Sequence, residues 1–135
     1  MFIVINNNKI SNFFLAQHIE KSHNISKGLF FENTKDACDY LTPLHTIISK
    51  PVYILINKDM PNINGWEFLE KCACAENNND YIHIVLMTKN ELDIEEEIKI
   101  NNYPNVTASN ISEIDNLFID DFVNKTYKST LLKTV

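Results

Sequence analysis

Residues 55 to 69 read Leu55-Ile56-Asn57-Lys58-Asp59-Met60-Pro61-Asn62-Ile63-Asn64-Gly65-Trp66-Glu67-Phe68-Leu69. The run from Val52 to Ile56 is almost wholly apolar, as expected of a central parallel strand that is covered on both faces. The pairs Met60-Pro61 and Asn64-Gly65 are typical of a loop, and a helix-like stretch opens at Trp66. The segment therefore predicts a buried strand, a polar loop and a helix in direct succession.

The same order of strand and helix repeats along the whole chain. This alternation predicts an α/β fold with a doubly wound (βα)5 parallel sheet of five strands in three layers. Ligands of such folds bind beyond the carboxyl ends of the strands. The other expected strands are Phe2–Ile5, Leu29–Phe31, Ile82–Met87 and a short one between Asn105 and Ile111, and the other expected helices are Ile10–Lys21, one capped by Thr34 that ends near Pro43, Glu91–Ile100 and Ser112–Tyr127.

Apolar side chains at helical spacing predict which face of each helix is buried. The pattern places Phe14, Leu15 and Ile19 inward in the first helix, and Ile94 and Ile98 inward in the acidic helix. In the last helix the expected buried residues are Ile114, Leu117, Phe118 and Phe122.

The chain of 135 residues has the length of one ordinary domain. We expect that domain to span residues 1–127, followed by a tail at 128–135. Leu131, Leu132 and Val135 make this tail either a frayed end or a docking segment.

Charge and composition exclude several function classes. A net charge of −6 disfavours nucleic acid as a partner, because binding phosphate requires a basic surface. The longest apolar runs are too short to span a bilayer, and the first residues lack the basic flank of a secretory leader, so we expect a cytoplasmic protein. Cys38, Cys72 and Cys74 are odd in number and lack zinc-site spacing, which favours free thiols.

The segment after the third expected strand closely resembles the signature of response-regulator receiver domains, in which an aspartate is followed by Met-Pro and then Gly. The opening Ile3-Val4-Ile5-Asn6-Asn7-Asn8-Lys9-Ile10 is similar to the receiver opening, where the first strand delivers acidic residues. Ile84-Val85-Leu86-Met87-Thr88 is similar to the fourth strand that ends in a switch Ser or Thr. The resemblance covers the chain to about Asn124 and implies a flavodoxin-like, CheY-like fold.

The chain departs from the receiver pattern at the reactive positions. Asn57 stands where the resemblance implies the phosphoacceptor aspartate, and an amide lacks the nucleophilic oxygen that phosphorylation requires. Asn6 and Asn7 stand where acidic residues would hold Mg²⁺, which prefers charged oxygen ligands. No lysine occurs between Val106 and Glu113, where the family has one. Thr88 alone remains, at the switch position.

These losses favour a degenerate receiver that is not an enzyme and needs no metal or other cofactor. Asn6, Asn7 and Asn57 are expected to hydrogen-bond one another or trapped water in a neutral pocket. The resemblance implies a protein partner: a sensor kinase, another regulator or a second copy of the chain. The acidic run Glu95-Glu96-Glu97 is a solvated helix face that hints at a basic partner.

Two alternatives stay open. Asp59 is either a solvated loop acid or a displaced phosphoacceptor that retains weak Mg²⁺ binding. The amide-lined pocket could also serve a small-molecule sensor. Metal dependence separates the phosphoacceptor from the degenerate receiver, and stabilisation by a ligand without metal identifies the sensor.

Overall fold

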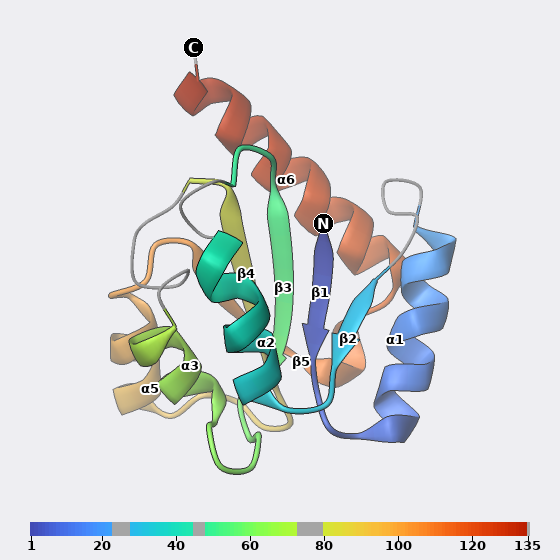
Figure 1. Cartoon of the computed structure of the whole chain (residues 1–135), viewed down its shortest axis with the longest axis vertical. Helices are drawn as coiled ribbons and strands as arrows, with labels where there is room; N and C mark the ends of the chain where they lie inside the picture. Colours follow the sequence, from blue (N-terminus) through green and yellow to red (C-terminus); the bar gives the residue numbers. More distant parts are fainter. Residues whose placement is uncertain (23–27, 45–47, 73–79, 135) are drawn as a thin grey trace.

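A computed structural model describes residues 1–22, 28–44, 48–72 and 80–134 of the chain, and it confirms the predicted fold class. Five strands form one sheet in the order β2-β1-β3-β4-β5, and every neighbouring pair is parallel (Figure 1). The strands are β1 (Phe2–Ile5), β2 (Leu29–Phe31), β3 (Val52–Asn57), β4 (Ile82–Thr88) and β5 (Val106–Asn110).

Helices cover both faces of this sheet. Side chains of α2, α3 and α5 pack into one core cluster, while those of α1 and α6 pack into a second cluster on the opposite face. The α helices are α1 (Lys9–Lys21), α2 (Thr34–Leu41), α3 (Gly65–Lys71), α5 (Ile94–Ile100) and α6 (Asn116–Thr134), and the short 3₁₀ turns are η1 (Thr42–Leu44) and η2 (Ile111–Glu113).

The central strands supply both clusters because successive side chains of a strand point to opposite faces. Ile3 and Ile5 of β1 enter the cluster beneath α2 and α3, whereas Phe2 and Val4 enter the cluster beneath α1 and α6. All residues of β1 and β3 are buried. This explains why the two strands read as continuous apolar runs and not as alternating ones.

Several helices begin at asparagine or aspartate caps. The side chains of Asn8, Asn33, Asn64 and Asp93 each accept a hydrogen bond from a backbone N–H in the first turn of the following helix. The prediction that Thr34 caps α2 is wrong, since Asn33 does so. The Thr34 hydroxyl instead donates to the Ile63 carbonyl at 2.8 Å, which ties α2 to the β3–α3 loop.

Four side chains predicted to face inward are exposed instead. Ile94 and Ile98 of α5 are 75% and 64% exposed, Leu117 of α6 is 71% exposed, and Phe14 of α1 is 53% exposed. On α5 the buried side is taken by Ile100 and by the ion-paired Glu96, so the two isoleucines point outward. Ile114, Phe118 and Phe122 do join the cluster beneath α6, as predicted.

Three helix boundaries differ from the sequence expectation. The acidic helix begins at Ile94 and not at Glu91, because Asp93 acts as its cap. Helix α6 begins at Asn116 and not at Ser112, which belongs to the 3₁₀ turn η2. It extends to Thr134, beyond the predicted end at Tyr127, so residues 128–134 of the expected tail continue the helix (Figure 1). Val135 and Cys74 lie outside the described residues. Within the parts of the chain that the structure describes, no helix is both long and apolar enough to span a membrane.

Candidate functional site

The site predicted at the carboxyl edge of the sheet forms around three side chains. Asn6 follows β1 directly, Asn57 ends β3, and Thr88 ends β4. They are polar but almost inaccessible, with exposed fractions of 0%, 7% and 5%. Buried polar groups are costly unless they are hydrogen-bonded, so their partners define what this site can do.

Two asparagine side chains bridge the central strands. The Asn57 side-chain nitrogen donates to the Asn6 side-chain oxygen at 2.9 Å, which confirms the predicted contact between them. Asn6 Nδ2 donates to both Ser11 Oγ and Asn12 Oδ1 at 2.9 Å, and Asn12 Nδ2 donates back to the Asn6 carbonyl at 2.8 Å. The network ties the first turn of α1 to β1 and β3.

Asn57 also uses its side-chain oxygen internally. This oxygen accepts from the backbone N–H of Asp59 at 2.9 Å, within the loop that follows β3. An amide supplies both the donor and the acceptor that these contacts need, whereas an ionised carboxylate only accepts. The arrangement therefore fits asparagine at position 57 better than aspartate.

Asn7 and Asp59 stand apart from this network. Both side chains are exposed. Asn7 was expected to hydrogen-bond Asn6, but Ser11 and Asn12 are the partners of Asn6 instead. The sequence signal that pointed to Asn12 was weak, because it lies one helical turn from Asn8 in a chain with many asparagines. Asp59 contributes its backbone N–H to the network, while its carboxylate is exposed. This fits a solvated loop acid better than a displaced phosphoacceptor.

Close packing explains the spacing between Asn57 and the glycine that follows it. A Cβ on Gly65 would lie 2.5 Å from the Leu86 side chain and 2.8 Å from the Lys58 Cα. The Gly65 N–H donates to the Lys58 carbonyl at 2.9 Å, and Met60 is buried in the core. Asn62 completes the loop in a left-handed conformation with φ of 65°.

The carboxyl ends of β4 and β5 lie side by side. Thr88 lies opposite Asn110 in the parallel register, so the neutral Asn110 ends β5, the strand near whose end the resemblance implies a lysine. Asn110 Nδ2 donates to the Lys89 carbonyl at 3.0 Å. The Thr88 hydroxyl is turned toward the Ser109 carbonyl at 3.5 Å, a long contact, and thus toward β5.

The metal ion that the resemblance implies does not fit these residues. Asn6 and Asn57 offer amide groups that are already engaged with each other. In the described part of the chain, no three His, Cys, Asp or Glu side chains come together as metal ligands would. Mg²⁺ prefers carboxylate or phosphate oxygens and water, so a neutral, internally bonded amide pair is a poor site.

A cluster of charged side chains lies beside the network. Glu96 Oε2 of α5 accepts from both Lys58 Nζ and Trp66 Nε1 at 3.1 Å. Lys99 lies over the Trp66 ring, 4.9 Å from its centre, and pairs with Glu70 at 3.0 Å. Burial raises the pKa of Glu96, but the hydrogen bonds from Trp66 and Lys58 outweigh this effect, and the pKa is lowered overall.

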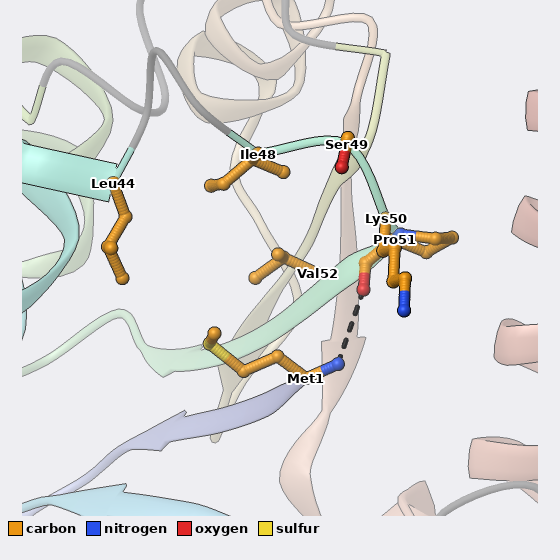
Figure 2. Close-up of a pocket in the computed structure, with 7 residues that line it drawn as sticks. All are labelled: Met1, Leu44, Ile48, Ser49, Lys50, Pro51 and Val52. Atoms are coloured by element: carbon orange, nitrogen blue, oxygen red, sulfur yellow. Dashed lines mark hydrogen bonds between the residues drawn. The ribbon is translucent and has the colours of Figure 1, made fainter.

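A cavity of about 290 Å³ lies at the opposite, amino end of the sheet. Figure 2 shows its lining, which comes from Met1 and from the segment that leads into β3, including Leu44, Ile48 and Val52. The Met1 amino group donates to the Pro51 carbonyl at 3.3 Å. The lining is largely apolar and supplies no acid–base pair, so the cavity adds nothing to the chemistry around Asn57.

The fold is similar to that of several solved receiver domains. A two-component response regulator from Cytophaga hutchinsonii matches with a TM-score of 0.72 and 20% identity, covering 94% of this chain and 96% of that chain. A response regulator receiver protein from Dyadobacter fermentans matches with a TM-score of 0.74 and 18% identity over 93% and 96%. The receiver domain of the Arabidopsis thaliana histidine kinase CKI1, complexed with Mg²⁺ and BeF3⁻, matches with a TM-score of 0.74 and 16% identity over 94% and 89%. No protein-family model and no curated protein matches the sequence.

Proposed function

We propose that this chain is a receiver-like module that acts through binding another protein and without accepting a phosphoryl group. The observation that carries this proposal is the buried hydrogen bond between Asn57 and Asn6. It occupies the place where phosphotransfer would require a free carboxylate and a metal ion.

The chemistry of the site supports the proposal at each reactive position. Formation of an acyl phosphate needs a carboxylate oxygen to attack phosphorus, and the amide of Asn57 has none. The charge of an incoming phosphoryl group would meet the neutral Asn110 at the end of β5, and no lysine lies between Val106 and Glu113, where the receiver pattern has one. Stabilising developing charge is a large part of phosphoryl-transfer catalysis, so its loss compounds the loss of the nucleophile.

The proposed module has no catalytic role and works in the cytoplasm. Its output is a complex with a protein: a sensor kinase, another regulator or a second copy of the chain. The receiver-like fold offers helical surfaces for such contacts, and the net charge of −6 argues against nucleic acid.

The direct test is phosphoryl transfer from acetyl phosphate in the presence of Mg²⁺, followed by intact-mass spectrometry. A receiver domain that retains its aspartate serves as the positive control. The expected mass is unchanged, and a stable gain of one phosphoryl group would contradict the proposal. Amide NMR with Mg²⁺ and beryllofluoride should likewise leave the signals of Asn6, Asn57 and Thr88 in place.

The same assay tests the alternative in which Asp59 is a displaced phosphoacceptor. If the mass does increase, the variant Asp59→Asn decides whether that exposed carboxylate is the acceptor. Loss of the added mass in this variant would assign a displaced phosphorylation site to Asp59. An unchanged gain would place the phosphoryl group elsewhere.

A further inference from the structure

Helix α5 presents two isoleucines to solvent. Ile94 and Ile98 are 75% and 64% exposed and lie one turn apart, on the same side of the helix. The opposite side is held against the molecule, because Glu96 binds Lys58 and Trp66 while Lys99 binds Glu70. These contacts fix the rotation of α5, so the isoleucines cannot turn into the core while they persist.

Carboxylates surround this apolar pair. Glu95 and Glu97 are exposed on either side of it along the helix. Glu97 also lines a cavity of about 530 Å³ together with Glu91 and Glu113. The polar remainder of that lining is formed by Thr88, Asn90, Ser109 and Asn110. The cavity therefore joins the end of β4, the end of β5 and the outer side of α5.

The nearby lysines do not neutralise these carboxylates. Lys58 and Lys99 are paired with Glu96 and Glu70, on the inner side of the helix. Lys89 is exposed at the carboxyl end of β4 but does not line the cavity. An acidic cavity thus adjoins an uncovered apolar pair.

We propose that this α5 surface, made of Ile94, Ile98, Glu91, Glu97 and Glu113, docks a cationic segment of a protein partner. A lysine or arginine side chain of the segment enters the acidic cavity, and neighbouring apolar side chains cover the two isoleucines. The inference rests on the proposed function, since it names the chemistry of the partner through which the module acts.

Charge complementarity selects this occupant over the others. Nucleic acid and anionic lipid carry the same charge sign as the α5 surface and are repelled. A second copy docked through the same surface would place its carboxylates against those of the first copy, because a two-fold contact brings the same surface of both copies together. A cationic segment with apolar side chains satisfies both features, since buried apolar contact supplies affinity and charge supplies specificity and rate.

The test is selection of a displayed library of random peptides about 12 residues long against the full chain, followed by measured affinities of the enriched peptides. The enriched peptides should combine Lys or Arg with apolar residues. Ile94→Ser/Ile98→Ser should weaken their binding about tenfold or more. Glu91→Gln/Glu97→Gln/Glu113→Gln should weaken it similarly and flatten its dependence on salt.

The matched control is Ile10→Ser/Phe13→Ser, which removes an exposed apolar pair from α1. Because all the substituted side chains are exposed, circular dichroism should show intact folding, and the control should bind within about twofold of the original chain.

Several outcomes would overturn the docking proposal. These are failure to enrich basic peptides, unchanged binding by both α5 variants, or loss of binding in the α1 control alone. Self-association that disappears in Ile94→Ser/Ile98→Ser would replace the cationic segment with a second copy. Two separate assays distinguish the two proposals. A gain in mass on treatment with acetyl phosphate and Mg²⁺ contradicts the proposed function, whereas unchanged peptide binding by the α5 variants contradicts only the docking site.

Discussion

Asn57 uses both its side-chain nitrogen and its side-chain oxygen inside the molecule, toward Asn6 and the backbone of Asp59. The pair Asn6–Asn57 is the buried hydrogen bond that replaces the charged arrangement implied by the receiver resemblance. An unpaired buried polar group costs about 1–3 kcal/mol, so the fold depends on this match of donor to acceptor.

Asn57→Asp should destabilise the chain by about 2–4 kcal/mol at neutral pH. A carboxylate at position 57 cannot donate to Asn6, and its charge would be buried without a cation. These effects raise the pKa of the new carboxyl in the folded state. The penalty should therefore be absent below the unfolded pKa, grow as pH rises above it, and level off above the folded pKa.

Urea denaturation at several pH values measures this effect. Asn7→Asp is the matched control, because that side chain is exposed and should tolerate the charge at every pH. Equal stability of Asn57→Asp and the original chain at neutral pH would show that the amide pair contributes nothing. Even when folded, Asn57→Asp alone should not accept a phosphoryl group, since Asn6 and Asn110 remain neutral.

Gly65→Ala should cost about 1–3 kcal/mol through close packing. The added methyl group would meet Leu86 at 2.5 Å and the backbone of Lys58 at 2.8 Å, and backbone atoms cannot move aside cheaply. Gly28→Ala is the control, since its shortest contact is 3.0 Å to the end of the Ile19 side chain. Thermal unfolding should show a clearly larger loss for Gly65→Ala, and the reverse order would contradict this account.

At the scale of elements, the strands could be predicted from sequence much better than the helix faces. An apolar run such as Val52 to Ile56 has one stable place, a central strand buried on both sides, so pattern and structure agree. Helix α5 has only seven residues, with Ile94 and Ile98 on one side and Ile100 on another. Contacts of Glu96 with Lys58 and Trp66 decide its rotation, and no local periodicity contains that long-range information.

Glu96→Gln should loosen α5 from the β3–α3 region and lower stability by up to about 1 kcal/mol at neutral pH. The folded pKa of Glu96 is lowered, so its contribution to stability is present above the unfolded carboxyl pKa and is lost as pH falls through the folded pKa. The original chain and the variant should therefore converge in acid, below the folded pKa of Glu96. Urea denaturation of the original chain and both variants at several pH values measures this. Glu97→Gln, on the outer side of α5, should show no such pH-dependent loss of stability.

Helices α2 and α3 bring two thiols together. The hydrogen bond with Cys72, followed by burial, raises the pKa of Cys38, so little reactive thiolate forms near neutral pH. Cys38 should be alkylated by iodoacetamide far more slowly in the folded chain than in urea. Cys72→Ala should accelerate that reaction, which peptide mapping would follow at Cys38 alone. An unchanged rate would mean that burial alone protects the thiol.

At the scale of the whole molecule, topology made the site predictable. A doubly wound parallel sheet delivers the ends of β1, β3 and β4 to one edge, so Asn6, Asn57 and Thr88 could be placed together from sequence. Asn12 and Asn110 could not, for different reasons. Asn12 reaches Asn6 through the orientation of α1, which the sequence does not specify. The position of Asn110 depends on the register of β5, and that register is ambiguous from sequence because this short strand has no continuous apolar run.

Global stability should be indifferent to Mg²⁺. A ligand that binds only the folded state raises the free energy of unfolding in proportion to RT ln(1 + [L]/Kd), so a real site would raise the melting temperature. At about 10 mM MgCl₂ we expect no shift beyond that produced by NaCl at matched ionic strength. The variant Asn6→Asp/Asn7→Asp/Asn57→Asp is the control, because three carboxylates at the carboxyl edge supply hard oxygen ligands and should make stability depend on Mg²⁺. A marked rise in the melting temperature of the original chain would mean that its amides, or Asp59, still hold a metal ion, and would remove the physical basis of the neutral site.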